Sequence, residues 1–379
     1  MTTDVVTFDG APPDGTINFG VGQPSADLLP VHLVREASEA FFAEAQPFDL
    51  NYGVPRGDRR FLDELASFLT RHYGSPATAD NLFVTGGNSQ AMSLVSTVFA
   101  SPGDTVFVEE PSYFLAFRIF RDHGLKIVAI PMDEEGPEIG ALEQALENHT
   151  PAFFYTIPSY HNPTGLSSSA ARRAQLVALA QERGLLIVAD EPYQLLYYYD
   201  KPAPALGTMT DSDAVLSMGS FSKILAPGMR LGWIQASDDL LQKILRIGLI
   251  HSGGCINHIS SHITRYAMSR GLLDAHMQEL RRAYRARVEA MDDALNEHFA
   301  EIADWTRPDG GYFMWLRLRD DEVDTAPLKN AALDAETGFT AGSLFSATGG
   351  LRNYLRLSFA HYHEDDIREG IARLRPLFD

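Results

Sequence analysis

The sequence predicts an α/β protein with a mostly parallel central sheet in a large domain and a smaller α+β domain. Between residues 82 and 235, short apolar runs alternate with helix-like segments, a pattern typical of a parallel sheet covered on both faces. Past about residue 275, a long charged helical segment and two further strands interrupt this alternation. We therefore place the large domain at 46–274 and assign 1–45 and 275–379 to an amino-terminal arm and the small domain.

The elements of the large domain follow from apolar runs, helical periodicity and turn residues. Asp58 precedes an amphipathic segment that ends at His72, and aspartate is a preferred helix N-cap. The expected strands lie at 82–84, 105–108, 127–130, 153–157, 185–189, 214–218 and 231–235. The other expected helices lie at 31–45, 91–100, 113–122, 138–148 and 170–183.

The small domain is expected to begin with a long charged helix over 275–298. Strands at 312–318 and 354–359 and a closing helix at 364–377 complete it. The polar stretch 1–15 indicates an irregular arm, and the acidic run 320–324 indicates a solvated loop. No repeat or low-complexity tract interrupts this organisation.

Composition limits the class of protein. The chain has 379 residues, a formal net charge of −19 and a sequence pI near 5.0, which argues against nucleic acid or an anionic membrane surface as the main partner. No stretch reaches the roughly 20 apolar residues that a membrane span needs, and the amino terminus has no leader pattern. Because Cys255 is the single cysteine, no internal disulfide forms. We expect a soluble, cytoplasmic protein.

The segment 216–233, LSMGSFSKILAPGMRLGW, carries the strongest chemical signal. An apolar run meets a turn, and Lys223 follows between Ser220, Ser222 and Arg230. A lysine that is partly desolvated beside cationic groups is a usable amine nucleophile, and the serine hydroxyls, backbone amides and Arg230 suit a phosphate. This combination is what pyridoxal 5'-phosphate (PLP) needs, although a solvated surface lysine remains the alternative on this segment alone.

Other strand ends converge on the same edge of the predicted sheet, where ligands of such sheets bind. The turn at 85–89, TGGNS, opens a helix whose free amides suit an anion, or it forms only a tight turn with Asn88 as cap. Asp190 could pair with a pyridine nitrogen or cap a turn. The same two interpretations, ligand contact or ordinary structure, apply to the ring contacts Tyr113, Asn162 and Tyr193 and to the close backbone approach at Gly22.

Arg356 is a charged residue in an otherwise apolar strand, YLRLS. Its alternate position indicates an inward guanidinium that suits bidentate carboxylate binding, the alternative being a buried ion pair. His251, His258 and His262 invite a metal interpretation, but no acidic or cysteine partner with ligand-like spacing accompanies them beyond Cys255. We therefore expect no metal site.

These motifs together resemble the class I/II aminotransferase family of fold type I PLP-dependent enzymes, which are aspartate aminotransferase-like in fold. The likeness runs from GVGQP to the carboxy-terminal helix and is carried by NPTG, DEPY, SFSKxxxPGxRxGW and LRLSF. It is closest to the 2-aminoadipate and kynurenine aminotransferases. The resemblance implies transfer of an amino group from an α-amino acid to a 2-oxo acid, by a ping-pong mechanism through a Lys223 Schiff base.

The resemblance also implies a role for each matching residue. Lys223, Asp190 and Tyr193 would be catalytic, and Gly22, Asn162 and Arg356 would bind the substrate carboxylate. Tyr52 would reach the phosphate in the site of a partner subunit, which implies a homodimer. The residues implied to bind PLP are Tyr52, Gly87, Asn88, Ser89, Tyr113, Asn162, Asp190, Tyr193, Ser220, Ser222, Lys223 and Arg230.

The sequence departs from the family pattern in three places, of which the first two leave the cofactor site intact and the third bears on substrate choice. His161 stands where glutamine or a small residue often precedes NPTG, Asn88-Ser89 replaces the usual Ser-Gln, and the arm before Ile17 is short. The tyrosines at 52, 113 and 193 are compatible with aromatic or long aliphatic donors, and Arg56 is a candidate for a side-chain carboxylate.

Two other functions stay open on the sequence. One is a different PLP-dependent reaction of an amino acid in a specialised pathway, such as elimination or replacement, decarboxylation or oxidation. The other is an aminotransferase-like sensor domain, which we rank last because such sensors carry an additional DNA-binding module and only the arm precedes GVGQP.

Overall fold

An eight-stranded sheet forms the centre of the computed structural model, which describes residues 15–254 and 256–379. Its strand order is β2-β9-β8-β7-β6-β3-β4-β5, and all strands run parallel except β9 and β5. The strands are β2 (Leu82–Thr85), β3 (Thr105–Glu110), β4 (Lys126–Asp133), β5 (Gly136–Pro137), β6 (Pro151–Thr156), β7 (Ile187–Asp190), β8 (Val215–Ser220) and β9 (Gly232–Ala236).

Helices cover both faces of this sheet because alternate strand residues point to opposite sides. Val106 and Val108 of β3 share one core with α3, α4 and α7, whereas Phe107 between them shares another with α5 and α6. The bounds of the helices that follow these strands are α3 (Asn88–Phe99), α4 (Phe114–Asp122), α5 (Ile139–Asn148), α6 (Ala170–Arg183), α7 (Asp238–Leu245) and α8 (Gly248–Gly253).

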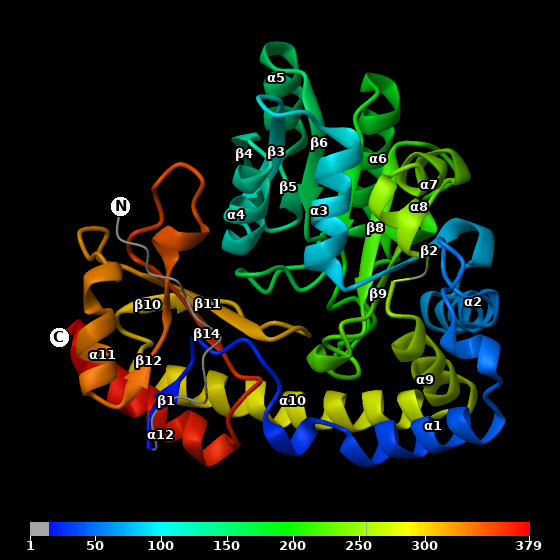
Figure 1. The fold of residues 1–379 in the computed structure, drawn as a ribbon. Coiled ribbons are helices and arrows are strands. Elements are labelled where there is room, and N and C mark those ends of the chain that lie inside the picture. Colours follow the sequence, from blue (N-terminus) through cyan, green and yellow to red (C-terminus); the bar gives the residue numbers. More distant parts are fainter. Residues whose placement is uncertain (1–14, 255) are drawn as a thin grey trace.

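A second, antiparallel sheet lies beside the first, and the long helix α10 (Leu272–His298) runs along the base of the molecule beneath both (Figure 1). At 1.5 Å per residue, α10 is roughly 40 Å long. The sheet has the order β10-β11-β14-β13, and β1 pairs in parallel with β12 next to it. The elements are β10 (Ala303–Trp305), β11 (Phe313–Leu318), β12 (Thr337–Gly338), β13 (Thr340–Ala341), β14 (Tyr354–Ser358), α11 (Lys329–Asp334), α12 (Glu364–Leu374) and β1 (Ile17–Asn18).

Three helices pack together near the amino-terminal end of α10, which α9 directly precedes in the chain. Helices α1 (Val31–Glu44) and α2 (Arg59–Tyr73) both pack against α9 (His258–Ser269). The sequence groups 1–45 with the small domain, yet α1 contacts α9, which lies inside 46–274, while β1 joins the small-domain strand β12. The domain boundaries therefore stay a prediction.

The fold class is confirmed, and each strand predicted in the large domain has a counterpart. The Asp58 side chain accepts a hydrogen bond from the Arg60 backbone amide and caps α2 as expected. The sequence patterns missed the helices α7, α8, α9 and α11. They also missed the short strands β10, β12 and β13, which lie outside the large sheet. Residues 1–14 of the predicted arm at 1–15, and Cys255, lie outside the described residues. Within 15–254 and 256–379, none of the helices has the length and apolar character to cross a membrane.

Candidate active site

Lys223 lies just beyond β8, within reach of the amino-terminal segment and of an aromatic ring. Its Nζ donates to the Gly22 carbonyl at 3.2 Å and sits 5.1 Å from the centre of the Tyr312 ring. Burial, together with the Arg356 cation, lowers the pKa of Lys223 to about 8, and Asp190 opposes this shift. A sizeable share of this lysine is therefore a neutral amine near pH 8, the form that attacks a carbonyl.

Asp190 ends β7, the strand next to β8, and both of its carboxylate oxygens accept hydrogen bonds. The Tyr155 hydroxyl donates to Oδ2 at 2.6 Å and Asn88 Nδ2 donates to Oδ1 at 2.5 Å. Burial raises the pKa of Asp190 to about 6, and these two hydrogen bonds oppose the rise. At neutral pH this is an ionised, oriented carboxylate in a buried position.

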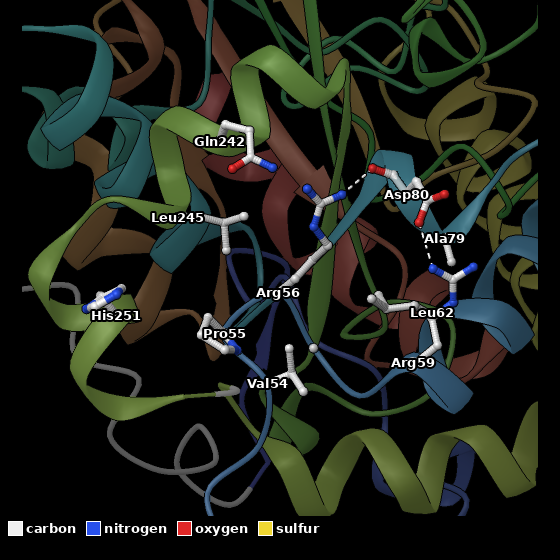
Figure 2. Close-up of a pocket in the computed structure, with 11 residues that line it drawn as sticks. Val54, Pro55, Arg56, Arg59, Leu62, Ala79, Asp80, Gln242, Leu245 and His251 are labelled. Atoms are coloured by element: carbon white, nitrogen blue, oxygen red, sulfur yellow. Dashed lines mark hydrogen bonds and ion pairs between the residues drawn. The ribbon is translucent and has the colours of Figure 1, made fainter.

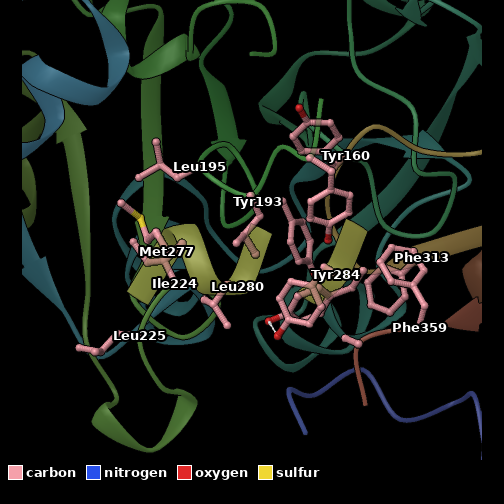
Figure 3. Packing of buried hydrophobic residues seen from close by; sticks show 14 of the residues in the cluster. Tyr160, Tyr193, Leu195, Ile224, Leu225, Met277, Leu280, Tyr284, Phe313 and Phe359 are labelled. Carbon is pink, nitrogen blue, oxygen red and sulfur yellow. Dashed lines mark hydrogen bonds between the residues drawn. The ribbon is translucent and has the colours of Figure 1, made fainter. Parts of the chain in front are cut away.

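Tyr193 belongs to a buried core cluster that also contains Tyr284 and Phe313 (Figure 3). The Tyr193 ring lies 5.4 Å from Tyr312 and 6.0 Å from Phe313, centre to centre. Burial raises the pKa of Tyr193 above its ordinary value and that of Tyr113 to about 12. Both phenols are therefore protonated at neutral pH and available as hydrogen-bond donors.

The start of α3 and a side chain from the loop after β8 offer donors that suit an anion. Gly87 is the N-cap, with a φ of 89° that favours glycine. Arg230 Nη2 donates to the Gly86 carbonyl at 2.9 Å. A Cβ at Gly87 would lie only 3.1 Å from the same Nη2 atom. The free amides of the first turn of a helix and a nearby guanidinium are what a phosphate needs. Ser220 ends β8 and Ser222 lies in the loop that follows, and the Ser222 amide donates to Ser220 Oγ at 3.1 Å.

Arg356 is buried in β14 and faces the site, as its alternate position in the strand predicted. Its Nη1 donates to Asn162 Oδ1 at 2.9 Å, and its Nη2 donates to Gly20 O and to Thr340 Oγ1, both at 3.2 Å. The guanidinium lies 4.0 Å from the centre of the Phe313 ring. Burial lowers the pKa of Arg356 to about 10, so it stays cationic at neutral pH.

Among the described residues, the guanidinium of Arg356 keeps one donor without a partner. Its Nε donor has no hydrogen-bond acceptor within the described part of the chain. Gly22 approaches closely, since a Cβ there would lie 3.2 Å from the Phe313 ring and 4.0 Å from Arg356 Nη2. The structure thus brings together Gly22, Asn162 and Arg356, the three residues that the sequence indicated for the substrate carboxylate.

The residues present fit PLP. A buried carboxylate suits a protonated pyridine nitrogen, a neutral amine suits the aldehyde, and the helix N-terminus with Arg230 suits the phosphate. The unpaired Nε of buried Arg356 adds a cationic donor for an amino-acid carboxylate. Fold and site define a PLP-dependent enzyme of fold type I.

The comparison with known proteins identifies the family. The model of the class I and II aminotransferases matches residues 14–374, and the chain belongs to this family. An aromatic-amino-acid aminotransferase of Thermococcus litoralis is 32% identical to it, over 98% of this chain and 88% of the relative. PLP-dependent transamination, predicted from the sequence, is confirmed as its activity.

Solved structures agree. The kynurenine aminotransferase of Pyrococcus horikoshii, crystallised with pyridoxamine phosphate, has a TM-score of 0.90 and 31% identity, covering 96% of this chain and 91% of that one. The α-aminoadipate aminotransferase of Thermus thermophilus, crystallised with N-(5'-phosphopyridoxyl)-L-leucine, has a TM-score of 0.87 and 31% identity, covering 96% and 92%. PLP is therefore the cofactor, as the sequence predicted.

Two residues singled out in the sequence lie away from this site in the single chain. Tyr52 is 81% exposed on the loop after the 3-10 turn at Pro47–Leu50. Arg56 pairs with Asp238 at 2.6 Å and also donates to the Asp80 carbonyl. It lines a separate cavity of about 450 Å³ together with Val54, Leu62 and Leu245 (Figure 2).

The histidines of α9 have an acidic neighbour that their sequence spacing did not reveal. His258 Nε2 and His262 Nε2 are 3.4 Å apart, and Asp58 Oδ2, at the start of α2, lies 3.8 Å from the latter. However, Arg60 Nη2 is 3.0 Å from Asp58 and 3.5 Å from His262 Nε2. Because the guanidinium already supplies the positive charge, we assign no metal to this cluster.

His161, the departure before NPTG, is fully buried next to Asn162. Its Nε2 lies 3.2 Å from Glu109 Oε2 without making a hydrogen bond to it, and Glu109 accepts hydrogen bonds from Thr156 Oγ1 and the Ile157 amide. This buried cluster lies directly before the loop that carries Asn162. Sequence patterns missed Tyr155, Tyr312, Phe313 and Thr340, because a tyrosine, phenylalanine or threonine in a strand is more often ordinary core.

Proposed function

We propose that Lys223 is the residue to which PLP attaches and that it moves the reacting proton. The observation that carries this proposal is a buried lysine whose pKa is lowered to about 8, within electrostatic reach of Asp190 and Arg356. When bound, PLP supplies an electrophilic carbon and an electron sink. Lys223 Nζ, once released from the cofactor, takes the proton from the donor's Cα and returns it on the cofactor side.

Asp190 holds the protonated ring nitrogen, which keeps the ring an electron sink. Tyr193 and Asn162 donate to the ring oxygen, and Tyr113 stacks on the ring. The phosphate binds at the first turn of α3, through Gly87, Asn88 and Ser89, with Ser220, Ser222 and Arg230 on its other side. Support comes from the ionised, doubly hydrogen-bonded state of Asp190 and from the position of Arg230 against Gly86.

Arg356 binds the carboxylate of the amino acid, with Gly22 and Asn162 beside it. An amino acid and a 2-oxo acid bind in turn at this one place, so the reaction is ping-pong. The unpaired Nε of Arg356 supports this assignment.

The donor is a neutral amino acid with an aromatic or long aliphatic side chain. The rings of Phe313 and Phe345 lie 4.0 and 5.0 Å from the Arg356 guanidinium, and Arg56, the candidate for a second carboxylate, is already paired with Asp238. Relatives named for aromatic amino acids and kynurenine support this donor class, and the structure of the relative named for α-aminoadipate holds a leucine adduct.

The enzyme is a cytoplasmic homodimer in which Tyr52 reaches the partner's phosphate. The loop that carries Tyr52 exposes a run of apolar side chains, which monomeric proteins rarely leave uncovered. Their exposed fractions are 75% for Phe48, 66% for Leu50, 81% for Tyr52 and 62% for Val54. A single cysteine in 379 residues is in keeping with a reducing compartment.

The test is a half-reaction. Holoenzyme is mixed with one amino acid at a time, without an oxo acid, and pyridoxamine phosphate and the oxo acid are quantified. Phenylalanine, tyrosine, kynurenine or leucine should each give one equivalent of both products per site, and aspartate should react far more slowly. Ammonia or carbon dioxide released over many turnovers would instead assign elimination or decarboxylation, and fast reaction of aspartate alone would overturn the donor class.

A further inference from the structure

Asn88 opens α3, where the family pattern assigns it to the phosphate. Its side chain points elsewhere: Nδ2 donates to Asp190 Oδ1 at 2.5 Å and to the backbone carbonyl of Met218 at 3.2 Å. Asp190 and Met218 lie on the neighbouring strands β7 and β8, and both are buried. The amide therefore links the start of α3 to the strand end that carries Asp190.

The orientation of this amide is determined by its neighbours. An NH₂ group has two hydrogens and here meets two acceptors, a carboxylate and a carbonyl. Rotating the amide by 180° would set Oδ1 against both of these oxygens, which is repulsive. Oδ1 itself has no donor among the residues that the structure describes, so no competing contact favours the rotated form.

The partner of Asn88 is a carboxylate that needs hydrogen bonds to stay ionised. Burial raises the pKa of Asp190 to about 6, and the donors Tyr155 and Asn88 act against this rise, each on its own oxygen. Hydrogen bonds to a charged acceptor are shorter and stronger than neutral ones. Serine, the usual residue at position 88, has a shorter side chain and a single donor hydrogen, so it cannot supply both of these bonds.

We propose that Asn88 is a positioning residue that acts through Asp190 and that its side chain does not hold the phosphate. The proposal rests on the proposed role of Asp190 at the ring nitrogen. The backbone amide of Asn88 remains part of the α3 N-terminus, whereas the side chain orients the carboxylate and preserves its charge. The phosphate cup and the ring-nitrogen contact are thereby joined through one side chain.

The test compares the binding of PLP with that of pyridoxal, which lacks the phosphate, to the full-length protein freed of its cofactor. In N88A, both ligands should bind about 10-fold more weakly, because the hydrogen bond lost belongs to Asp190. A loss confined to PLP would mean that the side chain holds the phosphate and would overturn the proposal. S89A provides the matched control in the same helical turn, with any loss limited to PLP.

A double-mutant cycle with D190N separates this proposal from the function on which it rests. If Asn88 acts through Asp190, N88A should change pyridoxal affinity in the wild type and leave it almost unchanged in D190N. Equal losses in both backgrounds would overturn the role of Asn88. Unchanged pyridoxal affinity in D190N alone would instead overturn the role proposed for Asp190.

The pH dependence of pyridoxal binding distinguishes a role of Asn88 in the ionisation of Asp190 from a role in stability alone, which would not change that pH dependence. Affinity should fall as Asp190 becomes protonated, near pH 6 in the wild type. Loss of the Asn88 donor raises the pKa of Asp190, so this fall should occur at a higher pH in N88A, and less so in N88S, which keeps one donor. An identical midpoint in all three proteins, with thermal unfolding unchanged, would contradict the proposal.

Discussion

The two sides of the site are built in different ways. The cofactor side comprises Gly87, Asp190 and Lys223. These residues lie at the start of α3, at the end of β7 and just after β8, all at the large sheet. The carboxylate side, comprising Gly22, Asn162 and Arg356, unites segments that are up to 336 residues apart, as in the bond from Arg356 to Gly20. The arrangement of the cofactor side follows from the topology of one sheet, whereas that of the carboxylate side depends on how the two sheets pack against each other. Substitutions should therefore separate cofactor chemistry from substrate binding.

The largest effect is expected on the cofactor side. K223A removes both the attachment point and the proton carrier, so turnover should fall by at least about 10⁴-fold. K223R keeps the charge and should be equally inactive, since arginine stays protonated. The rate of pyridoxamine phosphate formation in a single turnover measures the loss of activity in each variant. Activity of K223A near that of the wild type would contradict the role of Lys223.

A smaller, selective effect is expected on the carboxylate side. R356A should raise KM for the amino acid by about 10² to 10³-fold, because it leaves the substrate carboxylate without its buried cationic partner. The dissociation constant for PLP should change little. If PLP binding weakened as much as amino-acid binding, the two sides would not be separable.

Tyr52 tests whether the cofactor side is complete within one chain. Y52F removes only a hydroxyl from an exposed loop, and PLP affinity should fall about 10-fold if that hydroxyl reaches the partner's phosphate. The loss should disappear when pyridoxal replaces PLP. Equilibrium sedimentation of the wild type should give a dimer, and a monomer that binds PLP at full affinity would exclude this arrangement.

The smallest expected effect is the influence of the Arg356 charge, on the carboxylate side, on the pKa of Lys223, on the cofactor side. Only the neutral form of Lys223 captures the PLP aldehyde, so the capture rate should rise with pH and level off above about 8, the pKa given by burial and by Arg356. R356A removes a cation and should move this midpoint upward, whereas R356K keeps the cation and should not. Stopped-flow absorbance at a series of pH values measures the midpoints. Equal midpoints in all three proteins would show that Arg356 does not act on Lys223.

Much of this architecture is predictable from sequence because its determinants are local. Apolar runs defined the strands of the large sheet, Asp58 defined a helix start, and the alternation in YLRLS defined the inward side of Arg356. Parallel strands then bring their carboxyl ends to one edge. The cofactor and the α/β fold class followed from residues at that edge, and the reaction followed from the resemblance to the aminotransferase family; the comparisons confirm all three.

The rest depends on contacts between distant side chains. Nothing in GGNSQ indicates that Asn88 bonds a carboxylate 102 residues away, and nothing near Arg56 indicates a partner at Asp238. Likewise, Asp58 joins His258 and His262 only because α2 packs against α9. Helices α7 and α8 were missed because they are short, with eight and six residues.

The most direct test of the central assignment is to locate the cofactor on the chain. Holoenzyme is reduced with borohydride, digested, and analysed by peptide mass spectrometry for a phosphopyridoxyl group. The sequence has five lysines, at 126, 201, 223, 243 and 329, so the peptides distinguish them. The account predicts one equivalent of the group on Lys223 and none on the other four. Label on a different lysine, or a fully active enzyme that carries none, would contradict it.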